Sequence, residues 1–163
     1  MVTLFHVGFL VADIEEAIKR FEAVLGVTFH APSLQHLEVE MMHAPEPHRY
    51  DSLLTYSREG PPYFELMQAD GSEYKGLHQG ERIHHVGLWV SDVAEQMARN
   101  QANGLREEVT IHYPGTDRIR QWFTDPVTLH GVRLEFFDDA WAADFKTWVE
   151  SDWQSDLERQ AAT

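Results

Sequence analysis

The chain has 163 residues, a length that suits one compact domain or two small halves that share a core. Acidic residues outnumber lysines and arginines by 27 to 13, and the net charge of −14 argues against partners such as nucleic acids or anionic membrane surfaces. Cysteine is absent, which excludes disulfides and thiolate metal sites and fits a cytoplasmic protein.

An internal repeat organises the sequence. The segment 6–16 (HVGFLVADIEE) reappears at 85–95 (HVGLWVSDVAE), with His, Val, Gly, Val and Asp at the same spacing. Each copy is typical of a strand followed by a helix, because apolar residues then recur every three to four positions. Helix N-caps are expected at Asp13 and Asp92, and helix ends at Gly26 and at Asn103-Gly104.

Each half continues with three strand-like segments. Residues 34–42 alternate apolar and polar side chains, and clusters of glycine and proline separate the later segments. The order β-α-β-β-β is therefore predicted twice. The expected strands are 34–42, 50–57 and 62–68 in the first half, and 107–112, 118–124 and 131–137 in the second.

The predicted boundaries follow from this repeat. A first βαβββ module spans 1–70, a linker 71–81 and a second βαβββ module 82–138. Aromatic residues then recur at helical spacing from Trp141 onward, which predicts a C-terminal amphipathic helix over 139–163 that packs on the domain or on a partner chain.

Strand geometry gives the two repeated histidines the same orientation. In each copy, apolar residues at every second position form the face that a helix would cover, and His6 and His85 point away from it. His84 falls on the covered side, which predicts a packing or surface histidine. A single histidine in a strand is more often structural than a metal ligand, so the duplication carries the argument.

The last predicted strand of each half carries one carboxylate between apolar neighbours. Glu65 stands between Phe64 and Leu66, and Glu135 occupies the same place in the second half. An ionised Glu on an inward face costs several kcal/mol unless it is paired or bound to a cation. Two such Glu and two such His, repeated in register, most simply surround one metal: His6, Glu65, His85 and Glu135.

The ligand set has a chemical meaning. Two imidazoles and two carboxylates suit Zn²⁺, Ni²⁺, Co²⁺, Mn²⁺ or Fe²⁺ rather than Ca²⁺. An octahedral shell would leave two positions for water or substrate oxygens. A metal that holds a carbonyl oxygen stabilises an enolate formed beside it, and a carboxylate at the metal can act as the base.

These motifs resemble the vicinal oxygen chelate superfamily, which includes glyoxalase I, methylmalonyl-CoA epimerase, extradiol dioxygenases and the fosfomycin-resistance and bleomycin-binding proteins. The resemblance covers about 4–137. The segments 83–87 (IHHVG) and 125–135 (DPVTLHGVRLE) look most like the epimerase and glyoxalase-like branch. It implies an α+β fold whose tandem βαβββ modules form a curved, partly closed mixed sheet around a metal site. It also implies that the four residues match the ligand positions one by one.

The resemblance further implies two acid/base groups beside the substrate's α-carbon. Glu135 matches one of them. The other would be Glu38 or Glu40, which share a strand face with His36. On an inward face either Glu could be the base, whereas on an exposed face both would only be solvated.

The remaining expectations concern the substrate and the assembly. His36, Trp89 and Trp122 are expected to line the substrate pocket, and the tryptophans indicate a ring-containing or hydrophobic small molecule. The loops at 43–50 and 113–117 depart from the epimerase pattern, so methylmalonyl-CoA is not implied. A homodimer is expected because the family often pairs modules across chains.

Three functions remain open from the sequence. The leading one is a metal-dependent isomerase, epimerase or lyase that moves a proton beside a chelated carbonyl through a metal-stabilised enolate. The second is an Fe(II) dioxygenase that uses His6, His85 and Glu135, against which Glu65 argues because a fourth ligand removes an open site. The third is a metal-free binding protein of the resistance type, which the full ligand set disfavours.

Overall fold

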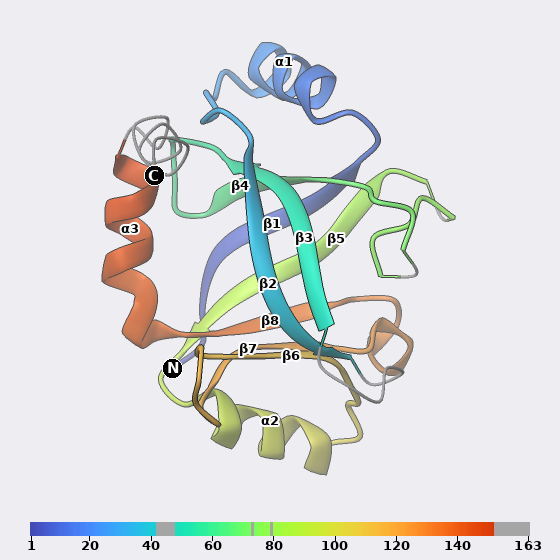
Figure 1. The fold of residues 1–163 in the computed structure, drawn as a ribbon, viewed down its shortest axis with the longest axis vertical. Coiled ribbons are helices and arrows are strands. Elements are labelled where there is room, and N and C mark those ends of the chain that lie inside the picture. Colours follow the sequence, from blue (N-terminus) through green and yellow to red (C-terminus); the bar gives the residue numbers. More distant parts are fainter. Residues whose placement is uncertain (42–47, 73, 79, 152–163) are drawn as a thin grey trace. The chain divides into compact units, whose positions relative to one another are not determined.

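The computed structural model describes residues 1–41, 48–72, 74–78 and 80–151 (Figure 1). Its elements follow the order β-α-β-β-β twice and end with a helix, which confirms the predicted α+β class. The first half contains β1 (Thr3–Val11), α1 (Ile14–Leu25), β2 (Ser33–Met41), β3 (His48–Tyr56) and β4 (Tyr63–Gln68). The second half contains β5 (Arg82–Val90), α2 (Val93–Ala102), β6 (Glu107–His112), β7 (Ile119–Thr124), the 3₁₀ helix η1 (Pro126–Leu129) and β8 (Leu134–Asp138).

The residues pack as two compact units that do not follow the repeat. One contains residues 1–5, 36–51 and 85–140, and the other contains 6–35, 52–84 and the residues from 141 onward. Several strands therefore contribute residues to both units. The module boundaries drawn from the repeat stay a prediction.

In the second of these units, α1 covers one face of the strands. β1 pairs in parallel with β4, and β3 pairs antiparallel with β4. Val11, Ile14, Phe29 and Leu66 form the buried core between α1 and these strands. Phe9 and Phe21 pack against this core. Their two rings also meet each other edge to face, with centroids 5.0 Å apart. The predicted apolar face of the first repeated strand is therefore the face under the helix.

The other unit repeats the arrangement around α2, which packs against β7 and β8 (Figure 1). β5 pairs in parallel with β8, while β7 pairs antiparallel with both β8 and β6, and β6 with β2. The sheet is therefore mixed, as predicted. Its core on the α2 side contains Val90, Val93, Trp122 and Phe136.

The predicted helix ends are confirmed. The Asp13 carboxylate accepts a hydrogen bond from the Glu16 backbone N–H at 3.0 Å, and Asp92 accepts one from Glu95 at 2.8 Å. Gly26 ends α1 with a φ of 71°, in the left-handed region that favours glycine.

The last strand begins three residues later than predicted. His130 and Gly131 have positive φ values of 52° and 86°, and the Gly131 N–H donates to the Pro126 carbonyl at 2.8 Å. Val132 likewise donates to Leu129. Because these backbone groups close the turn after η1, they cannot pair with a strand, and β8 begins at Leu134.

The predicted C-terminal helix is present but is described only in part. A short 3₁₀ helix, η2 (Asp139–Trp141), leads into α3 (Ala142–Glu150), and the predicted residues beyond 151 lie outside the described ranges. Phe145 and Val149 of α3 are buried. Among the described helices, none has the length and apolar character required to span a membrane.

Candidate metal centre

The first pair of ligand candidates lies on neighbouring parallel strands. β1 and β4 pair with Gly8 opposite Glu65, so no β1 side chain stands directly beside the carboxylate. His6 lies two positions before Gly8 and therefore on the same face. Its Nε2 atom is 3.4 Å from Oε2 of Glu65, and both side chains are buried. The neighbours Phe64 and Leu66 belong to the α1 core instead.

The second pair has the same construction. β5 and β8 pair with Gly87 opposite Glu135, and His85 lies two positions before that glycine. His85 Nε2 is 3.3 Å from Oε2 of Glu135, and both side chains are buried. Leu134 and Phe136 pack on the α2 side. The duplication seen in the sequence therefore produces two buried His–Glu pairs with matching register and spacing.

The spacing within each pair suits two ligands of one ion. Two donor atoms that bind a metal at about 2.1 Å lie roughly 3.0 to 3.4 Å apart for octahedral to tetrahedral angles. The observed separations of 3.4 Å in the His6 pair and 3.3 Å in the His85 pair fall in that range. They exceed the roughly 2.7–2.9 Å of a charge-assisted hydrogen bond.

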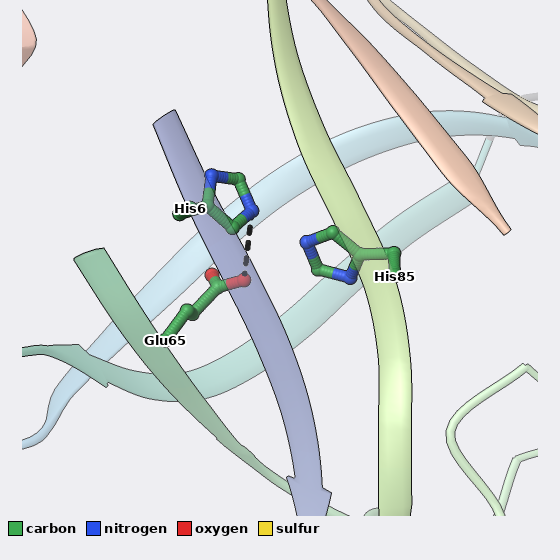
Figure 2. A group of neighbouring side chains, drawn as sticks. All are labelled: His6, Glu65 and His85. Carbon is green, nitrogen blue, oxygen red and sulfur yellow. Dashed lines mark ion pairs between the residues drawn. The ribbon is translucent and has the colours of Figure 1, made fainter. Parts of the chain in front are cut away.

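Three of the four candidates also form one group. Figure 2 shows His6, Glu65 and His85 with their side chains pointing toward one another, and each offers a ligand atom within 4.8 Å of the others. Two imidazole nitrogens and a carboxylate oxygen are a donor set that suits divalent transition metals. The buried group is therefore consistent with a divalent metal site.

His84, next to His85 in the sequence, has a different role. Its Nε2 atom lies 3.0 Å from the backbone carbonyl oxygen of Tyr74, and its ring meets the Tyr74 ring edge to face at 4.8 Å. It is buried by these contacts. The structure therefore shows His84 as the packing histidine that strand parity predicts, and a ligand role for His85 stays a prediction.

Each candidate carboxylate receives a hydrogen bond on the oxygen that does not face its histidine. The Tyr56 hydroxyl donates to Oε1 of Glu65 at 2.7 Å, and the Gln121 amide donates to Oε1 of Glu135 at 2.7 Å. Such outer hydrogen bonds fix the orientation of a ligand and tune its affinity. In both pairs, Oε2 is consequently directed at the imidazole.

The C-terminal helix helps to hold Tyr56. The Tyr56 ring packs edge to face against Phe145 and Trp148 of α3, with centroids 5.2 Å and 5.7 Å apart. It also meets the His6 ring edge to face at 5.6 Å. The aromatic residues that predicted α3 therefore support the hydroxyl that orients Glu65.

A buried lysine lies in the same unit as Glu65. The Lys75 ammonium donates a hydrogen bond to the Ser52 hydroxyl, and only 2% of the residue is exposed. Burial lowers the pKa of Lys75 to about 8 because it disfavours the charged form, and the carboxylates of Glu65 and Asp70 partly oppose that shift. No sequence motif marked this lysine, since it lies in the predicted linker.

The predicted second base lies on a strand with exposed side chains. Glu40 is half exposed and forms an ion pair with His112 at 3.6 Å. His36 is also half exposed and lies 2.6 Å from Asp51. The side chain of Glu38 lies outside what the structure describes. A catalytic role for Glu38 or Glu40 stays a prediction.

The two predicted pocket tryptophans occupy different surroundings. Trp89 stacks on Phe5 at 3.9 Å and meets Phe137 edge to face at 5.1 Å, and it keeps some exposure. Trp122 is fully buried in the α2-side core and stacks on Phe136 at 5.6 Å. Trp122 therefore fills the core in this structure, whereas Trp89 lies on the same strand face as His85.

Sequence reasoning missed the residues that support the carboxylates. Tyr56 and Gln121 are single polar residues in strands, with no repeat between them that could have marked them. Their roles depend on cross-strand register, which places Tyr56 opposite Glu65 and Gln121 opposite Phe137, beside Glu135.

A family model described as the Glyoxalase/Bleomycin resistance protein/Dioxygenase superfamily matches residues 5–123. The chain belongs to this superfamily. The matched range of this chain includes His6, Glu65 and His85 and ends before Glu135. A search of curated proteins gives no match.

Solved structures of methylmalonyl-CoA epimerases share the fold of this chain. The Mycobacterium tuberculosis enzyme is 22% identical, with a TM-score of 0.58 over 82% of this chain and 85% of that one. A variant of the Streptomyces coelicolor methylmalonyl-CoA epimerase, bound to 2-nitronate-propionyl-CoA, is 18% identical. Its TM-score is 0.56, over 82% of this chain and 92% of that one. An epimerase bound to methylmalonyl-CoA is 17% identical, with a TM-score of 0.57 over 83% and 93%.

The lowered pKa of Lys75 predicts a pH-dependent stability difference in the metal-free protein. Below about pH 8 the buried ammonium is charged in both the folded and unfolded states, so its desolvation penalty is fully present. The penalty disappears as the pH rises toward about 10.4, which is the pKa of a lysine in the unfolded chain. Lys75→Met should therefore be more stable than the wild type by about 3 kcal/mol at pH 7 and by little at pH 10.5.

Urea unfolding at the two pH values measures this difference. Lys19→Met, which removes an exposed lysine of α1, is the control for the loss of one positive charge. A stability gain of equal size at both pH values would contradict the assignment.

Proposed function

We propose that this chain is a divalent-metal-dependent enzyme that transfers a proton beside the carbonyl of a small substrate, as an isomerase, epimerase or lyase. The observation that carries the proposal is the pair of buried His–Glu units with matching spacing, 3.4 Å and 3.3 Å. Two buried carboxylates call for a cation, and the imidazole nitrogens select a transition metal. We infer that His6, Glu65, His85 and Glu135 bind one shared ion.

The bound metal would act as a Lewis acid that holds the substrate carbonyl and stabilises the charge of the enolate. The other steps belong to the chain's own residues. Glu135, held by the Gln121 amide on one oxygen, would take the proton from the carbon beside the carbonyl and return it. Glu65, held by Tyr56, would keep its place as a ligand.

The related structures support the reaction class. The ligands named in the epimerase structures, methylmalonyl-CoA and 2-nitronate-propionyl-CoA, are acyl-CoA compounds whose chemistry centres on the carbon beside a carbonyl. Glu65 gives the proposed site a second carboxylate ligand. Because a fourth protein ligand removes an open position on the metal, this favours proton transfer over ring cleavage by an Fe(II) dioxygenase.

The shared site predicts a binding stoichiometry of one. Protein stripped with a chelator should bind one Co²⁺ or Zn²⁺ per chain in calorimetric titration and elemental analysis. His6→Ala and His85→Ala should each weaken binding by more than the roughly 100-fold that loss of an outer partner costs. His84→Ala, the neighbouring packing histidine, should bind normally. Two ions per chain, or equal losses for His84→Ala and His85→Ala, would contradict a shared site.

The hydroxyl of Tyr56 should contribute to metal affinity. Tyr56→Phe keeps the ring that packs on α3 but removes the donor to Glu65, so the dissociation constant for Co²⁺ should rise about 10-fold. Tyr63→Phe is the matched control, because the Tyr63 ring packs against Phe145 at 5.6 Å and no described hydrogen bond joins it to Glu65. Equal effects of the two variants would remove the orienting role of Tyr56.

Proton transfer is tested by exchange with solvent. Wild-type protein in D₂O should introduce deuterium beside the carbonyl of a substrate, with methylmalonyl-CoA and a panel of 2-oxo and 3-oxo acids as the first probes followed by NMR. Glu135→Gln should retain the metal and lose exchange by about 100-fold or more. Glu65→Gln should lose exchange only through weaker metal binding, so excess metal should restore it. Unchanged exchange in Glu135→Gln would exclude Glu135 as the base.

A further inference from the structure

One arginine differs from the other arginines of its unit whose side chains the structure describes. Four of them form ion pairs with a carboxylate, whereas Arg120 has no carboxylate within ion-pair distance in the described part of the chain. In a chain with a net charge of −14, acidic partners are abundant, so this difference is informative. The paired arginines are Arg99 with Glu95, Arg106 with Asp125, Arg118 with Asp138 and Arg133 with Glu108.

The surroundings of Arg120 are only partly polar. Its Nη2 atom donates to Oε1 of Gln121 at 3.1 Å, and its Cζ atom lies 5.9 Å from the centroid of the Phe137 ring. Its Nε–H is buried and donates to no acceptor among the described residues. Burial lowers the pKa of the guanidinium, an effect that Tyr113 and Glu135 partly oppose. A buried donor on a charged group without an acceptor is costly unless a ligand supplies one.

Arg120 is connected to the proposed reaction centre within its own unit. The hydrogen bond from Arg120 fixes Oε1 of Gln121 as the acceptor, so the Gln121 NH₂ group faces Glu135 and donates to it at 2.7 Å. Phe137, under the guanidinium, packs edge to face with Trp89 at 5.1 Å. A cation and an aromatic surface therefore lie beside the Glu135 carboxylate.

We propose that Arg120 binds a carboxylate carried by the substrate in addition to its reacting carbonyl. The assignment of this anion to the substrate rests on the proposed function. Arg120 as a residue keeps some exposure although its Nε–H is buried, so a ligand would approach the guanidinium from the exposed side of the residue. Its Nε–H and remaining Nη hydrogens offer the fork that a carboxylate accepts with both oxygens.

A carboxylate fits this position better than a phosphate. One guanidinium neutralises one negative charge, and a doubly charged phosphate would leave an uncompensated charge close to Glu135. Trp89, which keeps some exposure and packs on the buried Phe137, adds an apolar surface for the carbon skeleton next to the carboxylate. The substrate class is therefore an oxo acid or a half-thioester of a dicarboxylic acid with an apolar substituent.

Binding of simple probes to the metal-free protein tests the anion site separately from the metal. By NMR titration, wild-type protein should bind phenylacetate at least 10-fold more tightly than phenylacetamide and more tightly than inorganic phosphate. Arg120→Gln should lose at least 10-fold in phenylacetate affinity. Arg118→Gln, which makes the same charge change two residues away on a paired arginine, should keep it.

Each contrary outcome has a defined meaning. Tighter binding of phosphate than of phenylacetate would overturn the carboxylate assignment, as would equal binding of phenylacetate and its amide. A change in Co²⁺ affinity in Arg120→Gln with unchanged phenylacetate binding would show that Arg120 only positions Gln121. If Arg120→Gln does not fold, Arg120→Lys, which keeps the charge without the fork, should show weakened binding, and full binding would contradict the proposal.

Failure of the two proposals can be distinguished. Protein that binds phenylacetate through Arg120 but no divalent metal would overturn the metal-dependent function and keep the anion site. Protein that binds one metal and exchanges a substrate proton but does not bind phenylacetate would overturn the anion site and keep the metal-dependent function.

Discussion

The structure depends on two carboxylates placed where water cannot solvate them. Glu65 and Glu135 are 4% and 3% exposed, and each lies beside a buried imidazole. Buried charge of this kind is strongly destabilising when it lacks a compensating partner. The His–Glu spacing suits ligands of a common ion, and a bound cation would offset the charge of both carboxylates. A bound cation would therefore serve both the stability of the fold and the proposed chemistry.

The rest of the fold builds this arrangement by separating the two faces of each strand. The residues that flank the carboxylates belong to the cores under α1 and α2, while the carboxylates point to the other face. Gly8 and Gly87 stand opposite the two Glu residues in the parallel pairs. Because glycine has no side chain, each Glu can reach the histidine two positions away. The same local register thus builds the same pair twice.

The two pairs differ in what holds them, and the roles that we propose for the two carboxylates follow this difference. Glu65 is oriented by a phenol that α3 fixes through aromatic contacts, and this suits a residue that acts only as a ligand. Glu135 is oriented by the Gln121 amide, which Arg120 in turn fixes. The second environment is polar and positively charged. It suits a carboxylate that exchanges a proton with an anionic substrate.

The sequence by itself determined the duplicated βαβββ order, the helix caps and the four ligand candidates, because a strand with one covered face fixes which side chains point the other way. It also separated His84 from His85 by parity alone. Only the tertiary structure brought Tyr56, Gln121 and Arg120 to the carboxylates, and placed Trp122 in the core. It also showed Glu40 to be half exposed. These features depend on which strands become neighbours and in what register, and a periodic pattern within one strand carries no information about its neighbour.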